Sequence, residues 1–131
     1  MIVLDSSAAI DYLLGLEPQA TWVEHQLDDA GWALHAPHVF DVEVVSGIRR
    51  LVHRQKLPPE RGAERARLLV DLRLRRYPHV QLLDRVWELH PNVTPADACF
   101  VALAEALNVP LVTTDERLSR VRRLRIPVVS P

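Results

Sequence analysis

The sequence predicts an α/β fold in which a central parallel β-sheet is flanked by helices, in three layers (α/β/α). The main observation is that short apolar runs alternate with longer segments whose apolar residues recur at helical spacing. The chain has 131 residues, of which 48% are hydrophobic and 25% charged, enough for one domain (residues 1–131) with an apolar core. No repeat, low-complexity segment or linker divides it.

The first half of the chain predicts two strands and three helices. In order, these are a strand at 2–4, a helix at 8–14, a helix at 20–29 ended by Gly31, a strand at 33–37 and a helix at 38–54. The second helix places Trp22, Val23 and Leu27 inward. In the third, apolar residues recur every three or four positions from Phe40 to Val52, which predicts one buried stripe.

The next segment is bounded by prolines on both sides. Pro58 and Pro59 break the chain, and a helix at 60–76 rich in arginine follows and ends before Pro78. We then expect a strand at 80–82 and a short helix at 83–90 with Trp87 packed inward. At the end of the chain, a helical turn begins at residue 116 and a strand occupies 126–129.

The stretch 94–115 predicts a helix, a turn and a strand. Thr94 is an N-cap candidate, and Pro95 suits the first helical position. The apolar residues that repeat at helical spacing are Ala96, Phe100, Leu103, Ala104 and Leu107. Asn108 and Pro110 end the helix, and a short buried strand at 111–112 runs into Thr113, Thr114 and Asp115.

Composition excludes several kinds of protein. No apolar run is long enough to cross a bilayer, and the chain passes from Met1 into a strand without a basic region or cleavage site, so we expect a cytoplasmic protein without a membrane partner. The single cysteine, Cys99, lies among apolar helical positions and is interpreted as a small buried hydrophobe. The four glycines form no phosphate-binding loop, which excludes a Walker or Rossmann turn.

Two predicted strands each end in an aspartate. Asp5 follows the strand at 2–4, and Asp115 follows the strand at 111–112. In open parallel sheets the carboxyl ends of the strands line the crevice where ligands bind, so these two residues should meet if their strands are neighbours. Asp97 opens the helix between them, and Glu43 stands among valines, where a buried acid needs a partner or a metal.

Each of these acids also has a purely structural interpretation. Asp97 can complete a capping box with Thr94, and Asp115 can form a turn. Glu43 can be a solvated residue at the edge of the apolar stripe, or one stabilised by the helix dipole. His35 and His38 straddle a proline, and Ser6 and Ser7 lack a Gly-x-Ser-x-Gly turn, so neither a zinc site nor an acyl-transfer triad is favoured.

The candidates that remain are the four carboxylates Asp5, Glu43, Asp97 and Asp115. Oxygen ligands without thiolate or imidazole select Mg²⁺ or Mn²⁺. Acids that hold such ions at the carboxyl edge of a sheet suit metal-assisted phosphodiester cleavage.

These residues carry a resemblance to a known family. The motifs are Asp5-Ser6-Ser7 after the first strand, Glu43 in an apolar helix start, Thr94-Pro-Ala-Asp97-Ala followed by Phe-Val-Ala-Leu-Ala-Glu, and Leu-Val-Thr-Thr114-Asp115. Together they resemble a PIN-domain nuclease over essentially the whole chain. The size resembles that of the VapC toxins of bacterial toxin–antitoxin pairs.

The resemblance implies a PIN-like fold and an endoribonuclease that holds Mg²⁺ or Mn²⁺ with the four acids. It implies supporting roles for Ser6 and Thr113, and Glu116 is the only candidate for a further acid after the last motif. It also implies an RNA substrate, a homodimer, and a small DNA-binding antitoxin whose tail enters the groove of the active site.

Arginine-rich segments at 61–76 and 117–125 are candidates for phosphate contacts with RNA. The alternative is that they solvate helix faces and pair with Glu60, Glu64 and Asp71. Two other functions compete with a nuclease. A phosphoacceptor receiver domain needs a late lysine, but Lys56 is the only lysine; the other rival is a catalytically silent domain that binds RNA or a partner.

Overall fold

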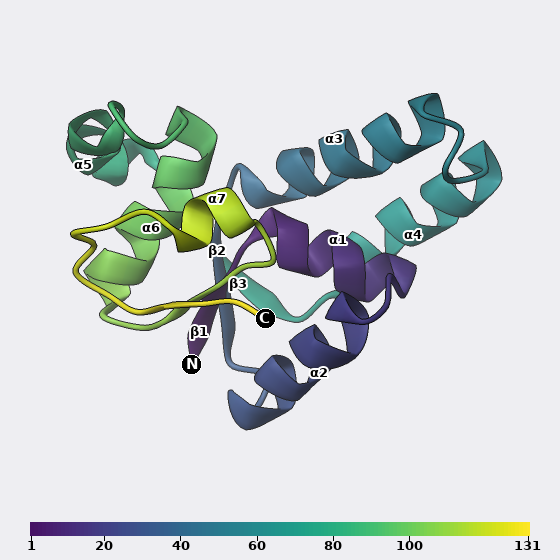
Figure 1. Cartoon of the computed structure of the whole chain (residues 1–131), viewed down its shortest axis with the longest axis horizontal. Helices are drawn as coiled ribbons and strands as arrows, with labels where there is room; N and C mark the ends of the chain where they lie inside the picture. Colours follow the sequence, from purple (N-terminus) through teal and green to yellow (C-terminus); the bar gives the residue numbers. More distant parts are fainter.

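The computed structural model describes residues 1–131. Its elements in chain order are β1 (Ile2–Leu4), α1 (Ser6–Leu14), α2 (Gln19–Asp29), β2 (Leu34–Pro37), α3 (Phe40–His53), α4 (Pro59–Asp71), β3 (Leu74–Tyr77), the 3₁₀ helix η1 (Val80–Leu82), α5 (Leu83–Leu89), α6 (Pro95–Leu107), β4 (Leu111–Val112), α7 (Glu116–Ser119) and β5 (Val128–Val129). Figure 1 shows α3 and α4 as a helical hairpin that extends away from the sheet.

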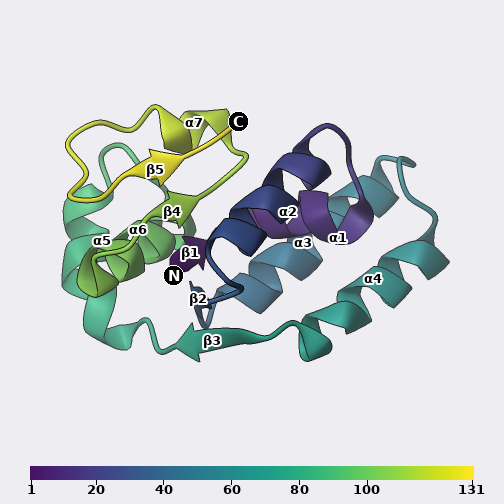
Figure 2. The ribbon, with the colours of Figure 1, turned by 90° about the horizontal axis from the view of Figure 1, so that it is seen from below.

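All five strands form one parallel sheet in the order β3-β2-β1-β4-β5. The central strand β1 pairs with β4, with Val3 opposite Leu111 and Leu4 opposite Val112. Helices α5 and α6 lie on one side of the sheet, and α1, α2 and α3 lie on the other (Figure 2). The predicted three-layer α/β/α fold is therefore confirmed.

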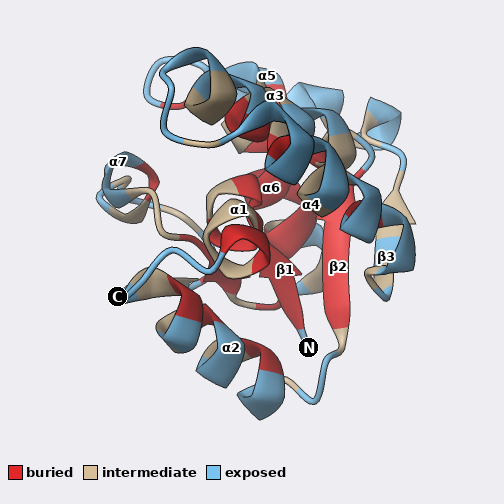
Figure 3. Ribbon diagram, turned by 90° about the vertical axis from the view of Figure 1, so that its right-hand side faces the viewer, coloured by how far each residue is buried: buried red, intermediate tan, exposed pale blue.

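The core lies where α1, α3 and α6 pack on β1, β2 and β4. Strands β1 and β2 are buried along their length, as Figure 3 shows. Phe40 of α3 and Phe100 of α6 are fully buried and meet edge to face, with ring centroids 6.5 Å apart. Such aromatic pairs add to the apolar area that the core removes from water. Cys99 is buried beside them, as expected.

Helix α6 begins and ends where its sequence predicts. The hydroxyl of Thr94 accepts a hydrogen bond from the main-chain N–H of Asp97 at 3.4 Å, and Pro95 occupies the first turn. Asn108 adopts the left-handed conformation with φ of 53° and closes the helix. The helix therefore delivers Asp97, in its first turn, to the edge of the sheet at a fixed position.

Two predicted elements and one predicted side-chain position were wrong. The helix expected at 60–76 ends at Asp71, and Leu74–Tyr77 is the edge strand β3, whose charged and only half-buried sequence carries no apolar run to reveal it. The strand expected at 80–82 is the 3₁₀ helix η1, which packs on α5 and α6. Trp87 is 70% exposed and stacks on His90 instead of packing inward.

No helix combines the length and the apolar character that a membrane span requires.

Candidate active site

Asp5 lies at the centre of the carboxyl edge of the sheet. It follows β1, and its main-chain N–H donates to the carbonyl of Val112 in β4 at 2.9 Å. Its side chain is buried, with the residue only 2% exposed. The hydroxyls of Ser7 and Thr113 donate to Oδ2 at 2.6 and 2.7 Å, whereas the buried Oδ1 has no hydrogen-bond partner.

This environment opposes the negative charge of Asp5. Burial raises the pKa of Asp5, the hydrogen bonds from Ser7 and Thr113 lower it in part, and the charge of Asp97 raises it again. A buried carboxylate oxygen without a donor costs free energy unless a cation or a proton meets it. The unpartnered Oδ1 and the all-oxygen donor set around it fit a hard divalent cation.

Asp97 is close enough to Asp5 for its charge to act on the Asp5 carboxyl group. It is half-buried in the first turn of α6. Burial raises the pKa of Asp97, its hydrogen bond with Thr94 lowers it, the charge of Asp115 raises it, and Arg117 lowers it. The predicted capping of α6 by Thr94 is confirmed. The charge of the Asp97 carboxylate is also coupled to those of Asp5 and Asp115.

Asp115 closes β4 and opens α7. Its Oδ1 accepts the main-chain N–H of Arg117 at 2.8 Å, so the turn-forming interpretation holds for this residue as well. The guanidinium of Arg117 reaches Oδ2 at 3.4 Å. The main-chain N–H of Asp115 donates to the Thr113 hydroxyl at 3.0 Å, which links Asp115 to Asp5 through one side chain.

The other predicted site residues lie outside this network. Glu43 is half-buried in the first turn of α3, and its side chain makes no hydrogen bond or ion pair. Ser6 is buried at the start of α1, and it is Ser7 that contacts Asp5. Glu116 is exposed and pairs with Arg120 at 2.9 Å. No three of the acids lie close enough to enclose a metal ion.

Two residues of α1 belong to the site but were not among the predicted site residues. Ser7 also accepts the main-chain N–H of Thr114 at 3.1 Å, and Asp11 accepts the Thr114 hydroxyl at 2.6 Å. Ser7 and Asp11 are four residues apart and therefore share one face of α1. The sequence signal was the single acid at Asp11 within the apolar run 8–14.

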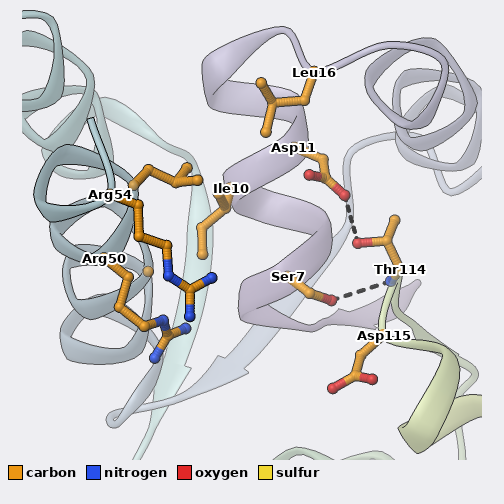
Figure 4. Close-up of a pocket in the computed structure, with 10 residues that line it drawn as sticks. Ser7, Ile10, Asp11, Leu16, Arg50, Arg54, Thr114 and Asp115 are labelled. Atoms are coloured by element: carbon orange, nitrogen blue, oxygen red, sulfur yellow. Dashed lines mark hydrogen bonds between the residues drawn. The ribbon is translucent and has the colours of Figure 1, made fainter. Parts of the chain in front are cut away.

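A pocket of about 330 Å³ opens beside these residues, between α1, α3 and the turn after β4. Its lining residues are Ser7, Ile10, Asp11, Leu16, Gly47, Arg50, Leu51, Arg54, Thr114 and Asp115. Figure 4 shows acids and hydroxyls on one wall and the guanidinium groups of Arg50 and Arg54 on the opposite wall. Asp115 belongs both to the pocket and to the group of acids.

A second hollow, of about 130 Å³, lies on the other side of the acids and is lined by Asp97 and Arg117, among others. Further along the chain, Arg117, Arg120, Arg122 and Arg123 line a cavity of about 450 Å³. In the other arginine-rich segment, Arg76 pairs with Asp41, and no arginine pairs with Glu60, Glu64 or Asp71. The part of the alternative interpretation that paired these arginines with those three acids is therefore wrong.

Comparison with known proteins identifies the family of the chain. Residues 2–124 match the family model described as the PIN domain. The chain is 44% identical to Ribonuclease VapC9 of Mycobacterium tuberculosis, over 98% of this chain and 96% of the relative. It is 41% identical to Ribonuclease VapC12 of the same species, over 92% of this chain and 91% of the relative.

Solved structures show the same fold. VapC20 of Mycobacterium tuberculosis, described as a toxin that cleaves the sarcin-ricin loop, superposes with a TM-score of 0.71 at 11% identity, over 91% of this chain and 93% of that one. VapBC2 of Rickettsia felis, solved with a promoter DNA fragment, superposes with a TM-score of 0.68 at 14% identity, over 99% and 98%. The chain belongs to the PIN-domain family and, within it, to the VapC ribonucleases, the toxins of toxin–antitoxin pairs.

Proposed function

We propose that this toxin hydrolyses RNA phosphodiester bonds with Mg²⁺ or Mn²⁺ bound by Asp5, Glu43, Asp97 and Asp115. The observation that carries the proposal is the buried Oδ1 of Asp5, which has no partner although Oδ2 has two. A cation would satisfy this atom and offset the burial and, to a smaller extent, the repulsion from Asp97, which together raise the pKa of Asp5.

The chain's own residues hold this arrangement in place. Ser7 and Thr113 fix Oδ2 of Asp5, so that the same carboxylate presents Oδ1 as a ligand. Helix α6 holds Asp97 by its first turn, and Thr113 fixes the main chain of Asp115. When bound, a divalent ion would acidify a water for attack on the phosphorus and stabilise the charge that develops on the phosphate oxygens.

Glu43 completes the proposed ligand set from α3. Its half-buried side chain forms no hydrogen bond or ion pair with another residue, so no protein partner competes with a cation for it. Ser6 and Glu116 keep supporting roles in the proposal. Helix α1 positions Ser6 directly after Asp5, and Glu116 follows Asp115 at the start of α7.

The partners of the toxin are part of the proposal. We infer an RNA substrate, a small DNA-binding antitoxin and a homodimer. The first two agree with the names of the relatives, which are ribonucleases, and with the Rickettsia felis VapBC2 structure on promoter DNA. The homodimer stays a prediction from the family resemblance.

The decisive experiment compares RNA cleavage by the purified protein with Mg²⁺, with Mn²⁺ and with excess EDTA. Cleavage should require the metal and stop with EDTA. Asp97→Asn keeps the side-chain shape but removes a ligand charge, so it should abolish cleavage and leave the fold intact. Asp84→Asn is the matched control, since Asp84 also lies in the first turn of a helix but is exposed and lines neither of the two hollows beside the candidate site.

The outcomes separate this function from its main rival. Cleavage that persists in EDTA, or in Asp97→Asn at the level of Asp84→Asn, would refute the metal mechanism. An intact protein that binds RNA but cuts none with either metal would instead be the catalytically silent binding domain.

A further inference from the structure

One face of α3 changes from acidic to basic along the helix. Glu43, Gly47, Arg50 and Arg54 are separated by four, three and four residues, which places them on one stripe of the helix. The last three line the pocket of about 330 Å³. The stripe therefore runs from an acid of the proposed active site to two arginines about 10 and 16 Å further along the helix axis.

These two arginines have no protein partner. Arg76, Arg85, Arg117 and Arg120 each pair with an acid, whereas neither Arg50 nor Arg54 forms an ion pair or a side-chain hydrogen bond. Both guanidinium groups point from α3 toward α1 across the pocket (Figure 4). Gly47 leaves room for the side chain of Ile10 between α1 and α3. A Cβ at this position would lie 2.2 Å from Cδ1 of Ile10 and 3.7 Å from Nη2 of Arg50.

The opposite wall offers acceptors instead of cations. Asp11 is half-buried and uses Oδ2 to accept a hydrogen bond from the Thr114 hydroxyl, and its Oδ1 forms no hydrogen bond within the protein. Asp115 stands beside it. Between the two walls, Ile10, Leu16 and Leu51 supply apolar surface. The pocket thus combines two free guanidinium groups, carboxylate acceptors and apolar surface. Its volume lies at the lower end of the range typical of ligand pockets.

We propose that this pocket binds one nucleotide of a single-stranded RNA substrate, next to the bond that is cut, with its phosphates on Arg50 and Arg54. The inference rests on the proposed nuclease function and adds to it a substrate subsite. Guanidinium groups form paired, charge-assisted hydrogen bonds with phosphate oxygens, and two of them one helical turn apart can hold the backbone of a strand.

The other features of the pocket favour a nucleotide over an acidic peptide. A nucleotide carries one phosphate for the arginines and uncharged N–H donors on its base for Asp11. An acidic peptide also has main-chain N–H donors, but its several carboxylates would be repelled by Asp11 and Asp115 on that wall. The apolar surface suits the face of an unstacked base, and single-stranded RNA is the form whose bases can turn out of the stack. Asp115 lies in the pocket and among the four acids, which places the bound nucleotide beside the reacting phosphate.

The test measures RNA affinity without cleavage. In the Asp97→Asn background, a short fluorescent single-stranded RNA is titrated and its anisotropy followed at several salt concentrations. Arg50→Gln and Arg54→Gln should each weaken binding about tenfold and lower the slope of log K against log salt by about 0.7, the value for one phosphate contact on a single strand. Arg49→Gln is the matched control, because Arg49 is exposed on α3 but does not line the pocket. It should change affinity less than twofold.

Cleavage by the otherwise unmodified protein provides an independent readout. Arg50→Gln and Arg54→Gln should raise KM about tenfold and leave kcat within about twofold, since they contact the strand and not the reacting group. A duplex RNA of the same sequence should compete poorly with the single strand.

The outcomes distinguish this subsite from the nuclease function. If the protein cuts no RNA, the nuclease proposal fails while the affinity measurement still tests the pocket. Equal losses in all three arginine variants would mean diffuse attraction to α3 and would overturn the subsite. Unchanged RNA affinity in Arg50→Gln and Arg54→Gln, with lost binding of a poly-glutamate peptide, would assign the pocket to an acidic protein segment and also overturn it.

Discussion

The hydroxyl of Thr113 donates a hydrogen bond to Oδ2 of Asp5 at 2.7 Å, joining residues 108 positions apart in the sequence. Thr113 is fully buried, and its oxygen also accepts the main-chain N–H of Asp115 at 3.0 Å. One hydroxyl therefore connects the aspartates that end two neighbouring strands.

Thr113→Val removes this hydroxyl at almost constant volume. The variant leaves Oδ2 of Asp5 with one donor and the N–H of Asp115 without its acceptor, so the free energy of unfolding should fall by about 2 kcal/mol. Urea denaturation in EDTA measures it. Thr114→Val is the control, because its hydroxyl bonds the half-buried Asp11 and should cost about half as much. An equal fall in the free energy of unfolding for both variants would show that the burial of Asp5 does not strengthen its hydrogen bond with Thr113.

Asp5→Asn should stabilise the protein in the absence of metal. Burial raises the pKa of Asp5 above its usual value of 3.8, so the folded state binds this proton more tightly than the unfolded state does. Stability that is present at low pH is therefore lost as pH rises from about 3.8 through the folded pKa. At neutral pH the uncharged amide avoids this loss, and Tm in EDTA should rise by roughly 4 °C, the shift that about 1 kcal/mol produces.

Added Mg²⁺ should reverse the order of these two proteins. The unmodified site binds the ion better, so Mg²⁺ should raise its Tm more than that of Asp5→Asn. Thermal melts with EDTA and with Mg²⁺, at a series of pH values, give both results. A lower metal-free Tm for Asp5→Asn, with no effect of Mg²⁺ on either protein, would make Asp5 a structural residue.

Glu105 should make the free energy of unfolding depend on pH in the opposite direction to Asp5, with stability lost as the pH falls. It is buried in α6 with its side chain 5% exposed, and Arg85 of α5 donates to it at 2.7 and 3.0 Å. Burial raises the pKa of Glu105, but the hydrogen bonds from Arg85 and the main chain of Arg125 outweigh it and hold the pKa below 4.5. The stability that this pair adds is present above about 4.5 and is lost as pH falls through the folded pKa.

Glu105→Gln should therefore lower the free energy of unfolding by about 2 kcal/mol at pH 7 and flatten its decline below pH 4.5. Urea denaturation at each pH follows both effects. Glu88→Gln provides the comparison, since Glu88 contacts the same arginine at 2.9 Å but its side chain is 57% exposed. Glu88→Gln should lower the free energy of unfolding by less than about 0.5 kcal/mol. Similar losses for both variants would contradict the role of burial.

Arg76→Gln should affect stability and leave RNA binding unchanged. Arg76 lies in an arginine-rich segment, but its guanidinium holds Asp41 of α3 at 2.7 and 2.8 Å and donates to the carbonyl of Leu69 in α4 at 3.0 Å. Because the pair is about one-third exposed, we expect a loss of about 1–2 kcal/mol in urea denaturation.

Arg75→Gln is the matched control for this variant. Arg75 is exposed on the same strand and lies over the ring of Tyr77, 5.1 Å from its centroid. Its replacement should cost less than about 1 kcal/mol. If Arg76→Gln weakens RNA binding while Arg75→Gln does not, Arg76 contacts the substrate and its pairing with Asp41 is not its main role.

Local chemistry in the sequence was enough to locate the main features of the fold. The strand before Asp5, the strand before Asp115 and the helix that Thr94 caps were all predicted, because buried strands and capped helices have signatures within a few residues. The prediction that Asp5 and Asp115 meet depended on their strands being neighbours, and the pairing of β1 with β4 fulfils that condition.

Tertiary contacts decided what no local pattern contains. The sequence of the edge strand β3 predicts a continuation of the arginine-rich helix before it. The contacts that make it a strand are long-range: its backbone pairs with β2, and its Arg76 pairs with Asp41 of α3. Trp87 lies outside because α5 buries Val86 and Leu89 instead. Ser7 donates to Asp5 two residues before it, but the same hydroxyl accepts the main-chain N–H of Thr114, 107 residues away. That second bond forms only when the two segments meet in the folded chain, so no pattern around the two serines shows that Ser7, and not Ser6, belongs to the site.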